Sequence, residues 1–182
     1  MPQPAGVEPA IGHRDWSKHI YSALTAAQVR QVAYVPDAGH KWLIELCEAD
    51  AALHAVSLTT EEEGIALLAG AWLGGARGAL LMQSSGVGNC VNMLSLVAEC
   101  RFPLLMIVTM RGEWGETNPW QVPMGQITRA VLERAGVIVH HVDRAQHVGD
   151  TVTAAAQLAF VSSRAVAVLI SQRLIGAKQF EK

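Results

Sequence analysis

The chain has 182 residues and a formal net charge of −2, and this composition excludes several classes of function. A chain of this length fits one domain with a substantial core, so we expect no second full domain. Lys and Arg form no stripe along the sequence, which argues against binding to nucleic acid or to a membrane surface. The longest apolar runs, such as residues 102–110, are far shorter than the roughly 20 residues that span a bilayer.

The balance of residue types also predicts contacts with other chains. Hydrophobic residues make up 51% of the sequence and charged residues only 16%. A solitary globular domain usually offers more polar surface than this. We therefore expect part of the apolar surface to be buried against other polypeptides.

The N-terminal segment and the cysteines indicate the domain boundary and the compartment. Residues 1–13 are rich in Pro, Gly and Ala and lack the charged and apolar regions of a secretory signal. We expect them to be a flexible segment ahead of a single domain, residues 14–182. Cys47, Cys90 and Cys100 lie in apolar periodic segments and form no C-x-x-C motif, so we interpret them as small core residues of a cytoplasmic protein.

From residue 15 onward, helical and short apolar segments alternate. The first half predicts helix 15–29, strand 31–35, helix 40–49, strand 53–57, helix 60–73 and strand 79–83. The second half predicts helix 90–100, strand 104–108, a helix ending near residue 136, strand 137–140, helix 146–161 and strand 165–170. Pro36 ends the first strand because proline cannot donate to a sheet ladder.

Six strands that alternate with helices predict an α/β fold with three layers, α/β/α, around a six-stranded parallel sheet. In such sheets, ligands bind at the carboxyl ends of the strands. The loops that follow strands are therefore the candidate site. Four of them carry informative residues: 36–40, 59–63, 84–89 and 110–122.

Three consecutive glutamates open the predicted helix that starts at residue 60. Thr59 with Glu62, and Thr60 with Glu63, have the spacing of a capping box, and acidic residues stabilise a helix N-terminus. The whole segment is therefore consistent with helix capping. Successive helix residues point about 100° apart, however, so only one of the three carboxylates can point into the cleft at the strand ends.

The segment Gln83-Ser84-Ser85-Gly86-Val87-Gly88-Asn89 lies between a buried strand and a helix. One interpretation is a tight turn with Asn89 as the helix cap. A functional interpretation is that the glycines allow a planar or anionic ligand to approach the backbone closely. The segment lacks the complete fingerprints of dinucleotide-binding and P-loop proteins.

Together these segments resemble the pyrimidine domain of thiamine-diphosphate-dependent enzymes and, within that group, sulfopyruvate and phosphonopyruvate decarboxylases. The resemblance covers roughly residues 30–130. It is carried by these segments: Val35-Pro36-Asp37, Glu61-Glu62-Glu63-Gly64-Ile65, residues 79–92, Arg101-Phe102-Pro103-Leu104-Leu105 and Gln121-Val122-Pro123-Met124-Gly125.

The resemblance implies a thiamine-diphosphate-binding fold of the pyrimidine-domain type and a catalytic glutamate. In the family, a glutamate hydrogen-bonds the pyrimidine nitrogen N1′, which favours the cofactor tautomer that removes the thiazolium proton. From the register of the resemblance we assign this role to Glu62, and we expect Glu61 and Glu63 to be capping and solvated residues. The remaining residues expected at the cofactor are Pro36, Gly86, Val87, Gly88 and Asn89.

The resemblance also places Asp37, His40 and Gln121 on the substrate side. His40 is alternatively a surface or capping residue of its helix, and Trp114 and Trp120 are candidates for a lid or a subunit contact. Related chains carry Ser where this one has Ala38, so a hydroxyl contact to an anionic substrate is missing. The candidates for a compensating cation are Lys41, Arg77 and Arg111.

The family motif for diphosphate and magnesium, Gly-Asp-Gly followed by Asn, is missing from the sequence. The nearest segment, Gly149-Asp150-Thr151, lacks the second glycine. The resemblance therefore implies a separate diphosphate-binding, beta-type subunit that holds Mg²⁺ and shares thiamine diphosphate with this chain, which itself supplies no metal ligand. We expect a hetero-oligomer with self-association, inactive without the partner.

The expected activity is that of a carboxy-lyase that converts a 2-oxo acid into CO2 and an aldehyde. Two alternatives stay open: a subunit of a two-chain thiamine-diphosphate carboligase, and a non-catalytic α/β assembly module. A generic flavodoxin-like or Rossmann-like domain fits less well, because the glycines follow a later strand than the first.

Overall fold

Six parallel strands form one sheet within residues 13–176, the part of the chain that the computed structural model describes. The strands are β1 (Val29–Tyr34), β2 (His54–Ser57), β3 (Arg77–Gln83), β4 (Leu104–Thr109), β5 (Ile138–Val142) and β6 (Ala165–Ile170). Their order is β2-β1-β3-β4-β6-β5, and every neighbouring pair is parallel. The predicted six-stranded parallel sheet is confirmed.

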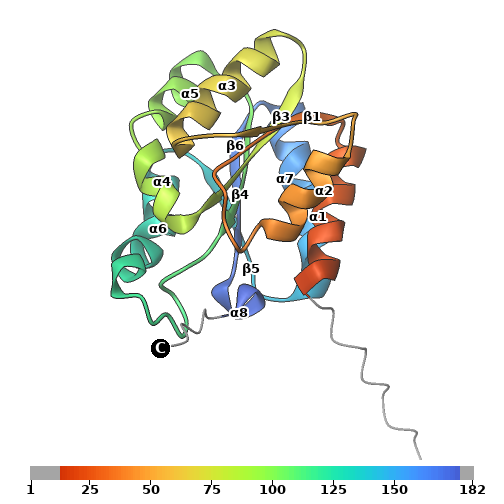
Figure 1. The fold of residues 1–182 in the computed structure, drawn as a ribbon. Coiled ribbons are helices and arrows are strands. Elements are labelled where there is room, and N and C mark those ends of the chain that lie inside the picture. The colour runs from red at the N-terminus through yellow and green to blue at the C-terminus, as the bar shows by residue number, and fades with distance from the viewer. Residues whose placement is uncertain (1–12, 177–182) are drawn as a thin grey trace, which may run out of the picture.

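Helices cover both faces of the sheet (Figure 1). One face carries α1 (His13–Ala26), α2 (Lys41–Ala49) and α7 (Val148–Ser162). The other carries α3 (Glu61–Leu73), α4 (Ser84–Cys90), α5 (Leu94–Cys100) and α6 (Val122–Arg134). Short helices η1 (Pro119–Gln121), η2 (Ala145–His147) and α8 (Gln172–Ile175) complete the fold. The predicted three-layer architecture is therefore confirmed.

The central strands are apolar throughout because both of their faces are buried. In β3, Leu81 packs into the core beneath α1, α2 and α7, whereas Leu80 and Met82 pack into the core beneath α3 to α6. In β4, Ile107 and Val108 divide between the two cores in the same way. Because side chains alternate along a strand, only a continuous apolar run can fill both cores.

The segment after β3 differs from the prediction. Residues 84–89 were expected to form a loop before one helix over residues 90–100, but they begin helix α4, and a turn at residues 91–93 separates α4 from α5. Val87 and Cys90 of α4 are fully buried. Packing therefore stabilises a helix that its serines and glycines disfavour. Cys100, predicted in the core, is exposed.

The structure covers only part of the two chain ends, and it tests the expectation that no segment spans a membrane for the described residues alone. Residues 1–12 of the predicted N-terminal segment, and residues 177–182 of the predicted domain, lie outside the described part, while His13 opens α1. None of the helices within residues 13–176 is both long and apolar enough to cross a lipid bilayer.

Gly125 is the point of closest approach between α6 and the backbone that follows β4. A Cβ atom at this position would lie 1.9 Å from the Arg111 carbonyl oxygen. We predict that Gly125→Ala lowers the free energy of unfolding by about 2 kcal/mol or more, because backbone must shift to accept the methyl group. Urea unfolding of the full chain measures this.

Gly70 of α3 is the matched control, because a Cβ atom there would meet nothing within 4 Å. Gly70→Ala should raise the free energy of unfolding by about 0.5–1 kcal/mol through the better helix propensity of alanine. Equal effects of the two substitutions would contradict the close approach at Gly125.

Candidate active site at the carboxyl ends of the strands

The Glu61 side chain packs against the start of α4, at the carboxyl end of β3. Glu61 is 8% exposed, and a Cβ atom at Gly86 would lie 2.3 Å from its carboxyl carbon. The side-chain amide of Asn89 donates a hydrogen bond to Glu61 Oε2 at 2.8 Å. We call Glu61, Gly86 and Asn89 the carboxylate cluster. It joins the glutamate segment at residues 61–63 to the glycine segment at residues 83–89.

Glu61 is the most buried of the three glutamates that open α3. Glu61 shares the buried side of the helix with Ile65 and Leu68, at the spacing of successive turns. Glu62 instead accepts a hydrogen bond from the Thr60 hydroxyl at 2.8 Å. Glu61 is thus buried against α4, whereas Glu62 is half-buried at the start of α3. The expectation that Glu62 is the glutamate facing the cofactor stays a prediction.

Glu63 behaves as a capping residue, as predicted, with Thr59 as an additional partner. Its carboxylate accepts hydrogen bonds from the Thr59 hydroxyl at 2.8 Å and from the Thr59 backbone N–H at 3.1 Å. These hydrogen bonds lower the pKa of the Glu63 carboxyl. Thr60 is the N-cap residue of α3, at the capping-box spacing from Glu63, but its side chain makes no capping hydrogen bond, and Glu63 binds Thr59 as well.

The other residues expected at the cofactor differ in solvent exposure: some are exposed and others are buried. Gly88 and Asn89 are exposed on α4, next to the buried Gly86. Val87 is fully buried in the core, so its side chain packs away from the cleft. Pro36 is exposed at the end of β1. The exposed residues of α4 near Glu61 are therefore Gly88 and Asn89.

The loop after β1 brings Asp37 to the end of β4. The Thr109 hydroxyl donates to Asp37 Oδ2 at 2.6 Å, and the backbone N–H of Gly39 donates to the same oxygen at 3.0 Å. A Cβ atom at Gly39 would lie 2.8 Å from that oxygen. These contacts fix a half-buried carboxylate at the carboxyl edge of the sheet.

His40 lies inside the protein at the same edge. It is fully buried, and its Nε2 lies 3.2 Å from the Met82 carbonyl oxygen and 3.0 Å from that of Ile107. Since both partners are acceptors, Nε2 carries the proton and donates to them. His40 is therefore not a surface residue, although it is the N-cap residue of α2, with no side-chain capping hydrogen bond. It joins α2 to β3 and β4.

Gln121, the last residue of η1, contacts the carboxyl end of β3. The Gln83 side-chain amide donates to Gln121 Oε1 at 3.1 Å and to the Ser85 hydroxyl at 2.6 Å. Gln121 is half-buried at the end of η1. The structure thus brings Gln121 beside the strand that leads into the carboxylate cluster.

A buried ion pair organises the long loop after β4. Arg111 donates to both carboxylate oxygens of Glu116, at 2.6 Å and 2.8 Å, and the two side chains are 9% and 3% exposed. Hydrogen bonds from Arg111 lower the pKa of the Glu116 carboxyl to about 2. The buried amide of Gln172 donates to the same carboxylate at 2.9 Å. The loop is therefore tied to α8, an element that sequence reasoning missed.

The three candidate cations for the hydroxyl contact missing at Ala38 differ in their positions and partners. Arg111 is held by Glu116, and Arg77 donates to the Ala27 carbonyl oxygen from the opposite end of β3. Lys41 is exposed, 4.0 Å from Glu45. It lines a cavity of about 440 Å³ together with Pro36, Asp37 and Ala38. Of the three, Lys41 alone lines this cavity.

The two tryptophans of the loop differ in their contacts. Trp114 is 43% exposed, and the Arg173 guanidinium lies 5.1 Å from its ring centroid. Trp120, in η1, is 87% exposed. Trp120 is thus a large apolar side chain in contact with solvent, beside Gln121. Among the described residues, no group of three or more His, Cys, Asp or Glu side chains is arranged to bind a metal.

The ion pair predicts a pH-dependent contribution to stability. We expect Glu116→Gln to lower the free energy of unfolding at pH 7 by about 2–4 kcal/mol, because the buried Arg111 loses its counter-ion. The folded-state pKa of Glu116 lies below its ordinary value of 4.5, so the contribution is complete above that value and is lost as the pH falls toward 2. Urea unfolding at pH 7 and pH 3 should show a smaller difference at pH 3.

Glu133→Gln is the control, because the Arg129–Glu133 pair has side chains 61% and 47% exposed. Its cost should stay below about 1 kcal/mol. A Glu116→Gln difference as small as this, or one that does not vary with pH, would contradict a stabilising buried pair.

Comparisons with known proteins agree on one family, although no protein-family model matches the chain. Sulfopyruvate decarboxylase subunit alpha from Methanococcus maripaludis is 41% identical over 118 residues, 64% of this chain and 71% of that subunit. The subunit alpha from Methanothermobacter thermautotrophicus is 34% identical over 157 residues, 86% of this chain and 95% of that subunit. Phosphonopyruvate decarboxylase from Streptomyces viridochromogenes is 40% identical over 116 residues, but the match covers only 29% of that enzyme.

A solved structure supports the fold independently. The chain superposes on 2-oxoglutarate:ferredoxin oxidoreductase from Magnetococcus marinus with a TM-score of 0.72 over 88% of its residues. It spans 29% of that chain at 15% identity, so this likeness concerns the fold alone. The identity to the Methanothermobacter thermautotrophicus subunit over almost its whole length is decisive: the chain belongs to the family of sulfopyruvate decarboxylase alpha subunits.

Proposed function

We propose that the chain is the pyrimidine-binding subunit of a two-chain, thiamine-diphosphate-dependent 2-oxo-acid decarboxylase that releases CO2 and an aldehyde. The family relationship supports the reaction type. The observation that carries the proposal is the carboxylate cluster, where a poorly exposed glutamate lies beside glycine backbone at the carboxyl edge of a parallel sheet.

The cluster fits the pyrimidine end of thiamine diphosphate. Gly86 gives the carboxylate room that a larger residue would take, and Asn89 fixes one of its two oxygens. The exposed Gly88 leaves backbone accessible to a flat ring, since it has no side chain. When bound, the cofactor supplies an electron sink for the electron pair released as the carboxyl group leaves as CO2.

Within this site, we assign to Glu61 the role that the resemblance had given to Glu62. Glu61 would share a proton with the pyrimidine nitrogen N1′. Its low exposure limits competition from water for that proton, and Asn89 orients the carboxyl group. Glu62 is turned toward Thr60, which supports a role at the helix N-terminus.

The substrate side would be formed by Pro36, Asp37 and Gln121, with His40 supporting them from within. Asp37 is positioned by Thr109, and Gln121 by Gln83. His40 would act on the site indirectly, by holding α2 against β3 and β4. On this chain, Lys41 is the cation available to an anionic group of the substrate.

The partner would be a diphosphate-binding, beta-type subunit that holds Mg²⁺, in a cytoplasmic hetero-oligomer that also self-associates. The relatives carry the name subunit alpha, which supports a second type of chain. The segment nearest to a diphosphate motif, residues 149–151, lies in α7, where a Cβ atom at Gly149 would be 3.2 Å from His19 of α1. A diphosphate loop at that position is therefore not supported. We propose no role in nucleic-acid or membrane binding.

Reconstitution tests the proposal. The chain would be co-expressed with a candidate diphosphate-binding subunit, and binding of thiamine diphosphate and release of CO2 would be measured with and without Mg²⁺ across several 2-oxo acids. We expect binding and turnover only with both subunits and Mg²⁺. Product analysis separates an aldehyde from a carboligation product. A stable complex that retains no cofactor would contradict the proposal.

Two single substitutions separate the glutamates. In the reconstituted complex, Glu61→Gln should lower kcat by about 100-fold or more, because the amide cannot exchange a proton with the ring nitrogen. Glu62→Gln should keep kcat within a few-fold of the parent. The measurement is steady-state CO2 release at saturating cofactor. Loss of turnover in Glu62→Gln alone would restore the register first inferred from the sequence.

Two glycine substitutions probe the cluster without the cofactor. A Cβ atom at Gly86 would lie 2.3 Å from Glu61, whereas at Gly88 the nearest atom, Met124 Sδ, is 3.4 Å away. Gly86→Ala should therefore displace Glu61 and shift the NMR signals of the Asn89 side-chain amide in the isolated chain. Gly88→Ala should leave these signals nearly unchanged. Identical spectra for both variants would contradict the packing described.

A further inference from the structure

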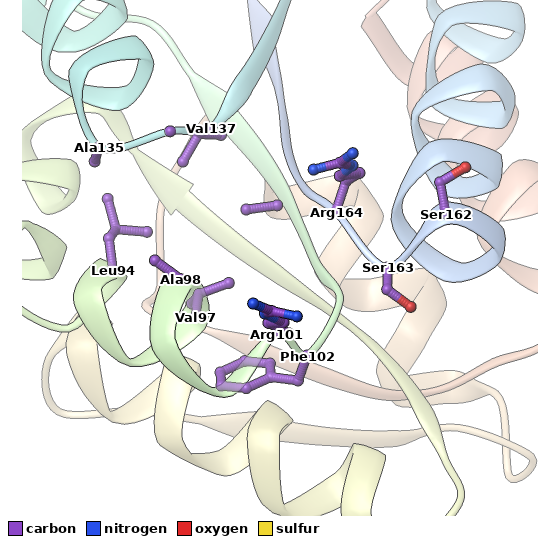
Figure 2. A pocket seen from close by; sticks show the side chains of 12 residues that line it. Leu94, Val97, Ala98, Arg101, Phe102, Ala135, Val137, Ser162, Ser163 and Arg164 are labelled. Atoms are coloured by element: carbon purple, nitrogen blue, oxygen red, sulfur yellow. The ribbon is translucent and has the colours of Figure 1, made fainter.

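A cavity of about 560 Å³ opens at the amino ends of β4, β5 and β6, the edge of the sheet opposite the carboxylate cluster. Its apolar wall is formed by α5 and the turn before β5. Its polar groups are two arginines and two serines. The lining residues that matter here are Leu94, Val97, Val137, Arg101, Arg164 and Ser163 (Figure 2).

We propose that this cavity binds a small organic anion, with a carboxylate or phosphate group held by Arg101 and Arg164 and an apolar part against Leu94, Val97 and Val137. Figure 2 shows both arginine side chains in the middle of the lining, with these apolar side chains to one side. The lining contains no Asp or Glu. Its charged side chains are therefore all cationic.

Both guanidinium groups are available to a ligand. Among the residues that the structure describes, neither Arg101 nor Arg164 makes an ion pair, a side-chain hydrogen bond or a ring contact, whereas Arg111 and Arg129 each bind a carboxylate. Arginine presents several donors in one plane, which suits the oxygens of a carboxylate or phosphate.

Helix C-termini at the cavity do not cancel this positive charge. Arg101 and Ser163 are the C-cap residues of α5 and α7, and the C-terminus of a helix is partly negative. One carbonyl near each helix end already accepts a hydrogen bond, however: Arg101 N–H donates to Val97, and Arg164 N–H donates to Ala159. The two full charges of the arginines therefore dominate.

The backbone at Arg101 supports a role for its side chain. Arg101 has φ 54° and ψ 34°, in the left-handed region where glycine is favoured over other residues. An arginine placed there costs conformational energy that glycine would avoid. A ligand contact gives a physical reason for the side chain, whereas the helix cap needs only the backbone N–H.

Phenyl phosphate is a suitable probe because it combines an anionic group with an apolar ring. It would be titrated into the isotope-labelled full chain at constant ionic strength, with the backbone amides followed by NMR. We expect saturable shifts at the lining residues with Kd of about 0.1–1 mM. The absence of saturable shifts up to about 10 mM would overturn the proposal.

Arg101→Gly is the decisive variant, because glycine suits the left-handed backbone and should not lower Tm. We expect it to weaken phenyl phosphate binding about tenfold or more, and Arg164→Gln to do the same. Arg144→Gln, an exposed arginine outside the cavity, is the matched control and should bind like the parent. Parental affinity in Arg101→Gly, or equal losses in all three variants, would contradict the proposal.

A repeat of the titration on the complex with the partner subunit distinguishes a free ligand from an acidic segment of the partner. Retained binding in the complex supports a small-molecule site. Loss of binding in the complex would show that the partner covers the two arginines, and it would overturn the proposal. None of these measurements depends on turnover, so the result is independent of the proposed decarboxylase function.

Discussion

The packing of the Glu61 carboxylate against the backbone of Gly86 is the constraint on which the rest of the site depends. The contact requires a glycine, because a Cβ atom there would overlap the carboxyl group. It also requires α4 to begin directly after β3, so that Asn89, one turn later, can donate to the same carboxylate. Ser84 supports this start, since its hydroxyl accepts from the Arg111 backbone N–H at 3.0 Å. One short helix thus joins α3, β3 and the segment after β4.

The charges at this edge of the sheet are arranged so that few remain available to a substrate. Arg111 neutralises Glu116 inside the loop, and Thr109 and Gly39 donate hydrogen bonds to Asp37. In Glu61, Asn89 binds Oε2 and Gly86 packs against Oε1. The chain therefore offers a prepared carboxyl group but little positive charge. A diphosphate and its metal ion would find their ligands on another subunit, which fits the proposed division of the site between two chains.

The local sequence pattern was sufficient to predict the layers of the fold, but not which residues are buried at the candidate site. The runs in β3 and β4 and their alternation with helices predicted the buried parallel sheet correctly. The resemblance assigned the cofactor-facing role to Glu62, but it did not predict that Glu61 is the most buried of the three glutamates. The spacing of Glu61 to Ile65 and Leu68 was a usable signal for that burial, because it places Glu61 on the buried side of α3. Helix α4 and the burial of His40 depend on contacts with β3 and β4, which no local pattern reveals.

A structure of the chain in complex with its diphosphate-binding partner, thiamine diphosphate and Mg²⁺ tests the central assignment most directly. The assignment predicts a Glu61 carboxylate oxygen within about 2.6–3.2 Å of the pyrimidine nitrogen N1′. It also predicts that Asn89 still donates to the other oxygen. A pyrimidine ring beside Glu62, or one enclosed entirely by the partner subunit, would contradict it.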